Sequence, residues 1–147
     1  MHIQSIFAAA VLGILISNPS SAKSKDVDAL FERTEPAQAT MTLTEEGEAW
    51  RVTFRAGGIP NGDATAADCE LEAVGSQDLE GVISARVVPF DGELNTVTAA
   101  DIGDDAAVIE VNVGPEGAFV TDSGASARYC GLGSDIDGFY QRADVGY

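Results

Sequence analysis

The strongest structural signal in this chain is the stretch ATMTLTEEGEAWRVTFRA at residues 39–56. Apolar side chains stand at alternate positions before and after an acidic Glu-Glu-Gly-Glu turn, and threonine or arginine separates them. This period of two is typical of strands with one buried and one solvent-exposed face, and so short a turn joins two of them as a β-hairpin. The sequence therefore predicts a domain of antiparallel strands.

Further strands are expected along the rest of the chain, each bounded by glycine- or proline-containing turns. They cover residues 69–74, 81–88, 107–113, 118–121 and 137–142, with a short strand around 95–98. Seven or eight strands at spacings of about 10–15 residues, without a long helix, predict an all-β fold. We expect a small antiparallel β-sandwich or barrel.

The segment before this domain, residues 23–38, has a different pattern. Val27, Leu30 and Phe31 stand at helical spacing, enough for one or two turns that end before Pro36. We expect a short N-terminal helix docked on the domain or a mobile lead-in, and the sequence leaves both open. The predicted organisation is a signal peptide over 1–22, this lead-in over 23–38 and a β domain over 39–147.

The signal peptide is predicted from the apolar run at residues 6–16, followed by small residues at Ser20 and Ala22. The run is too short to span a bilayer, which takes about 20 residues. Cleavage after Ala22 would leave a periplasmic or secreted protein. The part before the run lacks lysine and arginine, so an uncleaved anchor and a different cleavage site stay open as alternatives.

Cys69 and Cys130 are the only cysteines, and both lie in the part predicted to be exported. Disulfides form and persist in oxidising compartments, so we expect these two to be bonded. Closing a loop of this length would stabilise the fold by roughly 4 kcal/mol, because the bond restricts the unfolded chain.

The net charge is −16, from 24 acidic and eight basic side chains. A field of this sign repels phosphate backbones, which excludes nucleic acid as a partner and favours a cationic one. The alternative is that the acidic surface serves solubility alone.

No catalytic residue and no cofactor are predicted. The only histidine, His2, would leave with the signal peptide, which removes serine and cysteine triads and the usual zinc sets. Paired carboxylates could still hydrolyse a glycan, because a glycosidase needs two acids about 5–10 Å apart.

Two acidic groups are candidate calcium ligands. Asp135 and Asp137 stand in an Asp-x-Asp-Gly sequence like the middle of an EF-hand loop, but flanking helices and the closing glutamate are missing. Asp101, Asp104 and Asp105 form the second group. The alternative for both is a polar turn whose aspartates satisfy the backbone.

The candidate recognition patch consists of Arg128, Tyr129, Tyr140 and Arg142, because aromatic and arginine side chains dominate protein interfaces. The alternative is that the aromatics pack in the core. From charge and compartment we expect an exported, non-enzymatic, acidic binding protein that acts on a protein or cell-envelope partner. One form would be an inhibitor of a cationic cell-wall hydrolase such as lysozyme. A calcium-dependent structural or adhesive module and a carboxylate-based glycan hydrolase are the alternatives.

Overall fold

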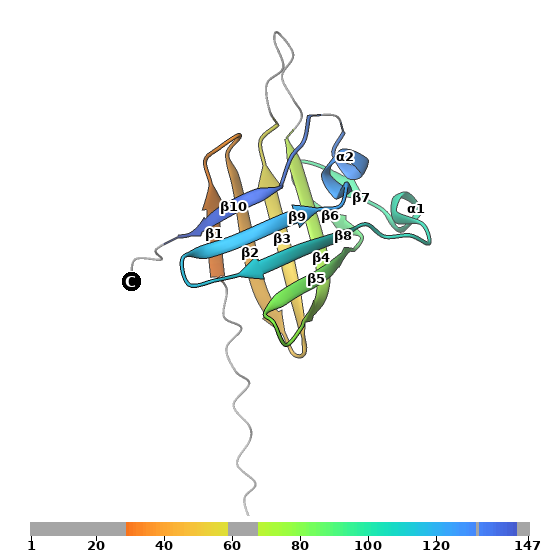
Figure 1. Ribbon diagram of the computed structural model, residues 1–147. Coiled ribbons are helices and arrows are strands. Elements are labelled where there is room, and N and C mark those ends of the chain that lie inside the picture. Colours follow the sequence, from red (N-terminus) through yellow and green to blue (C-terminus); the bar gives the residue numbers. More distant parts are fainter. Residues whose placement is uncertain (1–28, 59–67, 132, 144–147) are drawn as a thin grey trace, which may run out of the picture.

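The computed structural model describes residues 29–58, 68–131 and 133–143. Eight strands close into one antiparallel barrel in the order β1-β10-β9-β8-β5-β4-β3-β2 (Figure 1). Their bounds are β1 Ala29–Arg33, β2 Ala39–Glu46, β3 Ala49–Ala56, β4 Cys69–Gln77, β5 Val82–Val87, β8 Val108–Val113, β9 Gly117–Asp122 and β10 Gly138–Arg142. The predicted all-β antiparallel fold is confirmed, and the barrel form is the one adopted.

The predicted β2–β3 hairpin is present, and its side chains alternate as expected. Met41 lies opposite Phe54, and Leu43 lies opposite Val52, all of them buried inside the barrel. Gly47 turns the chain between the two strands with a φ of 69°, a conformation that costs glycine little. The threonines and arginines between the buried residues face outward.

The prediction for residues 23–38 is wrong in its described part. Ala29–Arg33 is strand β1 and not a helical turn; it pairs with β2 over five residues and with β10 over two. Phe31 and Arg33 point into the barrel because β1 closes the ring between β2 and β10. The barrel domain thus begins ahead of residue 39. Val27 and the predicted signal peptide lie outside the described residues.

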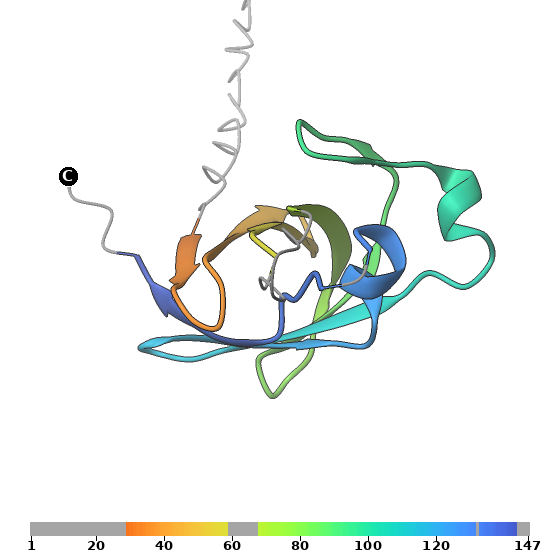
Figure 2. The same cartoon turned by 90° about the horizontal axis from the view of Figure 1, so that it is seen from above.

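The barrel interior is filled by side chains, which an eight-stranded barrel is just wide enough to hold. The largest fully buried side chains belong to Tyr140, Phe31, Phe54, Met41, Leu71, Ile83, Ile109 and Ile136. Ile136 does not belong to a strand. Residues 133–137, which include it, lie across the end of the ring before β10 (Figure 2). This segment therefore covers one end of the barrel.

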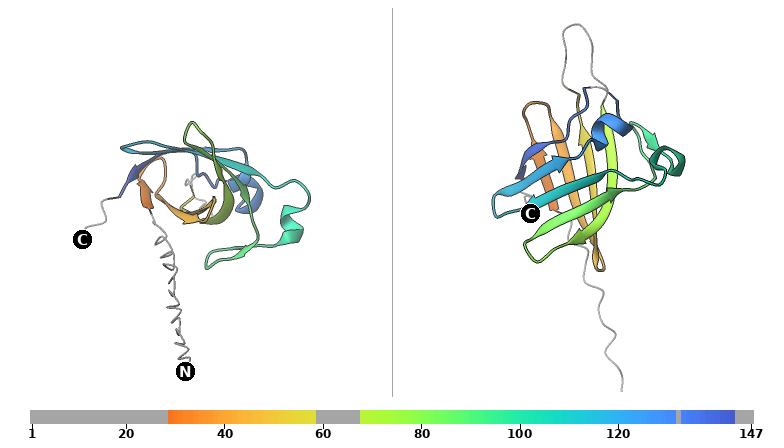
Figure 3. Two further views of the ribbon diagram at one scale, coloured as in Figure 1. Left: turned by 90° about the horizontal axis from the view of Figure 1, so that it is seen from below. Right: turned by 45° about the vertical axis from the view of Figure 1, so that its right-hand side comes forward.

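Between β5 and β8 the chain leaves the barrel and forms a side arm, which projects to one side of the ring in Figure 3 (left). The arm contains β6 Phe90–Asp91, β7 Thr96–Val97 and helix α1 Ala99–Ile102, and β7 lies where a short strand was predicted. The Asn95 side chain holds the arm on β4: its Oδ1 accepts from the Glu70 N–H at 2.7 Å, and its Nδ2 donates to the Glu70 carbonyl at 3.0 Å. An amide side chain thus pairs with β4 in the way a neighbouring strand would.

The predicted disulfide between Cys69 and Cys130 is confirmed. Cys130 directly follows helix α2, Ala125–Tyr129. The bond ties the first residue of β4 to the end of this helix. Neither helix in the described ranges has the length and apolar character needed to cross a membrane.

Candidate interaction surface

The four residues predicted as a recognition patch do not form one surface. Tyr140 is fully buried in the barrel, where its ring meets Phe54 edge-on with centroids 6.1 Å apart. Arg142 lies over the Phe31 ring at 4.8 Å. Arg128 and Tyr129 lie on α2. For Tyr140, the alternative that it packs in the core is the one the structure adopts.

Arg128 fastens the side arm to α2. Its guanidinium lies 5.0 Å from the centre of the Tyr129 ring and donates to the Ile102 carbonyl at 2.7 Å and to the Asp105 carbonyl. A guanidinium has five donors in a fixed fork, which suits it to collecting several carbonyls of one loop. The contacts of Arg128 are therefore internal to the protein.

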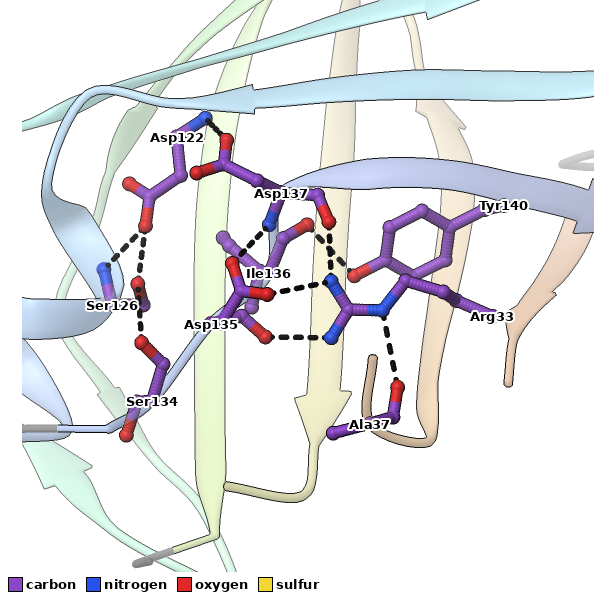
Figure 4. A network of polar contacts seen from close by, with 9 residues as sticks. All are labelled: Arg33, Ala37, Asp122, Ser126, Ser134, Asp135, Ile136, Asp137 and Tyr140. Carbon is purple, nitrogen blue, oxygen red and sulfur yellow. Dashed lines mark hydrogen bonds and ion pairs between the residues drawn. The ribbon is translucent and has the colours of Figure 1, made fainter. Parts of the chain in front are cut away.

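A second group of polar side chains closes the covered end of the barrel, and we call it the closing cluster (Figure 4). Its members are Arg33, Asp122, Ser126, Asp135, Asp137 and Tyr140. Arg33 is 4% exposed, and its guanidinium donates to the carbonyls of Ala37 and Asp135 at 3.2 and 2.8 Å and to that of Asp137. It also pairs with the Asp135 carboxylate at 3.3 Å.

Arg33 completes the seam of the barrel because β1 pairs with only two residues of β10. Beyond that pairing, the guanidinium donates hydrogen bonds to the carbonyls of Asp135 and Asp137, which precede β10. Its charge lies 5.4 Å from the centre of the Tyr140 ring, within the range of a cation–π contact. The Tyr140 hydroxyl in turn donates to the Ile136 carbonyl at 2.9 Å, so the buried polar groups have partners.

The aspartates of the closing cluster also accept hydrogen bonds from backbone N–H groups. Asp122 accepts from the N–H groups of Ala125 and Ser126 at the start of α2, and the Asp122 N–H donates to the Asp137 carboxylate. Burial raises the pKa of Asp137, and the nearby carboxylates of Asp122 and Asp135 add to this shift. Burial likewise raises the pKa of Tyr140.

The calcium candidates are divided between two places. Asp135 and Asp137 belong to the closing cluster, where the Asp135 carboxylate faces Arg33. Asp101 forms a capping box with Thr98 at the start of α1, and these hydrogen bonds lower its pKa. Asp104 and Asp105 are exposed at the end of the side arm. Within the described ranges, no three acidic, histidine or cysteine residues gather in a way that could hold a metal ion.

Among the described residues are two exposed aromatics that the sequence did not single out, Phe119 and Phe139. They lie directly opposite each other on β9 and β10, and they are 55% and 52% exposed. Their neighbours Ala118, Val120 and Tyr140 point into the barrel. A period of two through these strands already requires both phenylalanines to face outward, so strand alternation was the signal that could have found them.

A hollow of about 420 Å³ lies beside this pair, at the turn between β8 and β9. It is lined by Asn112, Gly114, Pro115, Glu116, Gly117, Phe119 and Phe139. Gly117 has no room for a side chain, since a Cβ there would lie 2.7 Å from the Phe139 ring and 2.2 Å from the Tyr140 carbonyl oxygen. The Phe139 ring thus rests on bare backbone and forms one side of the hollow.

Strands β8, β9 and β10 are neighbours in the barrel (Figure 3, right). We call the surface made by their outward-facing residues the outer wall. It consists of Glu110, Asn112, Phe119, Thr121, Phe139 and Gln141. Arg142 is the only basic residue of these three strands, and it lies across Phe31. The charged groups on the outer wall and its β8–β9 turn are carboxylates, those of Glu110 and Glu116.

A further hollow of about 590 Å³ lies at the rim near the β1–β2 connection. Its lining mixes polar and apolar residues and includes Gln38, Arg55, Asp68 and Leu94. Gly57 and Asp68 of its lining flank residues 59–67, which lie outside the described ranges.

Comparisons of this chain with protein-family models, with curated proteins and with solved structures find no match.

Proposed function

We propose that this chain is an exported, acidic, non-enzymatic binding protein and that its partner is a cationic protein. The observation that carries this proposal is the exposed Phe119–Phe139 pair in a wall whose charged groups are carboxylates. Contiguous exposed apolar surface rimmed by polar residues marks interaction sites. Aromatic side chains also supply much of the binding energy in protein interfaces.

The charge of the whole chain supports a cationic partner. With a net charge of −16, the protein attracts basic surfaces over a distance set by the ionic strength and so speeds their encounter. The disulfide agrees with an oxidising compartment outside the cytoplasm. A cell-wall hydrolase with a basic surface, such as a lysozyme, has the matching charge and acts in that space. We propose inhibition of such an enzyme as the concrete form of the function.

The test is to mix the purified, disulfide-bonded protein with lysozymes of several types at low salt. We expect loss of lytic activity with at least one of them, and weaker inhibition as salt is added. The variant Phe119→Thr/Phe139→Thr should lower the affinity at least about tenfold, as for a central apolar contact.

The matched control is Leu79→Thr, because Leu79 is a fully exposed apolar residue on the β4–β5 turn and is not part of the outer wall. It should leave inhibition unchanged. No inhibition and no binding of any basic hydrolase would contradict the lysozyme form of the proposal. Binding that both variants reduce equally would contradict the role of the outer wall.

A further inference from the structure

We infer that the hollow beside Phe139 is a socket for one apolar side chain of an extended basic segment, in which a lysine or arginine flanks the apolar residue. This inference rests on the proposed function and names the chemistry of the segment that the outer wall recognises. Three properties of the hollow support it: its lining, the order of its turn and the charge at its rim.

The lining is suited to an apolar side chain. Phe119, Phe139 and Pro115 surround the hollow, and the glycines at positions 114 and 117 bring backbone in place of side chains. A volume of about 420 Å³ exceeds what one leucine or phenylalanine side chain occupies. Because the hollow is open to solvent, filling it would remove water from both phenyl rings, which is favourable in proportion to the apolar area covered.

The socket is already formed in the free protein. The Gly114 N–H donates to the Gly117 carbonyl at 2.8 Å, and the Arg142 N–H donates to the Glu116 carbonyl at 3.1 Å. These bonds tie the β8–β9 turn to itself and to β10. A segment that binds here would not have to order the turn, and a preformed site loses less entropy on binding.

The rim of the socket selects for positive charge. Glu116 is an exposed residue of the lining, and Glu110 lies farther along β8. In the described part of the chain, neither carboxylate belongs to an ion pair, although Arg51 and Arg55 pair with other glutamates. A lysine or arginine beside the inserted side chain would meet a carboxylate that has no competing partner.

The same charges disfavour a second copy of this chain as the occupant. Two outer walls placed face to face would bring the carboxylates of Glu110 and Glu116 from both copies into one interface. Each chain also carries a net charge of −16. Like charges facing each other across an interface are destabilising, so the charge pattern favours a basic partner over self-association.

The experiment is an NMR titration of the disulfide-bonded protein with three short peptides at low salt. The probe is acetyl-Lys-Lys-Leu-Lys-Lys-amide, and the comparison peptides replace the leucine with serine or the lysines with glutamates. We expect the first peptide to shift the amide signals of Asn112, Glu116 and Gly117 and to bind at least about fivefold more tightly than either other. Loss of the leucine removes buried apolar area, and reversal of charge removes the attraction to Glu116.

Two variants locate the binding. Phe139→Thr should weaken binding of the probe peptide about tenfold. Glu116→Gln should weaken it about two- to fivefold, as for one exposed ion pair, while its matched control Glu80→Gln on the β4–β5 turn should have no effect.

Equal binding of the leucine and serine peptides, or shifts confined to another surface, would overturn the socket. Concentration-dependent dimers that Phe139→Thr abolishes would overturn it too, because the wall would then bind a second copy. Lysozyme binding that still depends on the phenylalanine pair would leave the proposed function standing in either case. Failure of the lysozyme test alone, with the peptide result as expected, would reject that partner and keep the socket.

Discussion

Phe139 and Tyr140 are adjacent in β10, yet they belong to two regions that differ in almost every respect. Tyr140 lies in the closing cluster, where its ring meets Arg33 and Phe54 and its hydroxyl meets the Ile136 carbonyl. Phe139 lies on the outer wall, with half of its surface exposed. The whole Tyr140 side chain is buried against other parts of the protein, whereas about half of Phe139 is exposed to solvent.

The charged residues of the two regions differ in the same way. Arg33 and Asp135 meet each other and local backbone groups inside the closing cluster. Glu110 and Glu116 take no part in an ion pair within the described ranges. Polar groups that are paired at a buried site are explained by stability, since leaving them unpaired there is costly. An exposed apolar pair beside unpaired charges lacks that explanation, and this contrast is why we assign binding to the outer wall. Four predictions test it, in order of expected effect.

The largest loss of stability should follow from removing the disulfide at the closed end. We expect Cys69→Ala/Cys130→Ala to lower the free energy of unfolding by about 4 kcal/mol, because the unfolded chain gains the freedom of the opened loop. Chemical denaturation measures this. Parent protein under reducing conditions should unfold at the same denaturant concentration as the variant. A loss below about 1 kcal/mol would contradict the prediction.

The next largest loss should come from Arg33→Met, which we expect to lower the free energy of unfolding by about 3 kcal/mol. The substitution leaves carbonyls at the seam and the Asp135 carboxylate without their donor. Methionine keeps an apolar stem of similar length, so the loss reports mainly the polar contacts. The matched control is Arg55→Met, which removes an exposed ion pair with Glu93 and should lower the free energy of unfolding by less than about 1 kcal/mol. Equal losses in the two variants would show that Arg33 does not close the barrel.

The neighbouring aromatics should separate stability from binding. Phe139→Thr should cost less than about 1 kcal/mol of stability, as for an exposed cross-strand pair, and should still lower partner affinity at least about tenfold. Tyr140→Phe removes a buried hydrogen bond and should lower the free energy of unfolding by about 1 kcal/mol, but it should leave partner affinity unchanged. Melting curves and the inhibition assay would measure the two effects. A variant that changes both quantities together would weaken the contrast.

The smallest effect concerns Asp137 and depends on pH. Its pKa is raised in the folded protein, so the charged form is disfavoured there, and the resulting destabilisation is present above this pKa and disappears as the pH falls through it. Asp137→Asn removes the charge and keeps an oxygen that can accept from the Asp122 N–H. The variant should melt above the parent at pH 7, and the gap should close towards pH 3. A gap that grows on acidification would show the opposite sign of the pKa shift.

Sequence reasoning found the strands whose side chains alternate clearly, and these include the β2–β3 hairpin, β4 and β8. It also found the disulfide, because a pair of cysteines allows one bond. It missed β1, since Leu30 and Phe31 fit a helical spacing as well as a strand in so short a segment. It missed α2 too, whose five residues carry no strong periodic signal. Both are shaped by contacts with distant parts of the chain.

The four residues predicted as a recognition patch lie apart for a related reason. Arg128, Tyr129, Tyr140 and Arg142 were grouped by residue type and nearness in sequence, but adjacent residues of a strand face opposite sides. Alternation alone would have placed Phe119 and Phe139 outside. It could not have placed them opposite each other, because the register between β9 and β10 depends on the whole barrel.

By itself, the sequence determined the strand-forming alternation, the disulfide pair and the acidic charge, since each follows from residue types and short spacings. Only the tertiary structure decided that Arg33 closes the seam, that Asn95 pairs with β4 in place of a strand and that a hollow lies beside Phe139. These features join residues far apart in the chain, and they depend on how the ring of strands closes. The closure is a property of all eight strands together, and no local stretch of sequence specifies it.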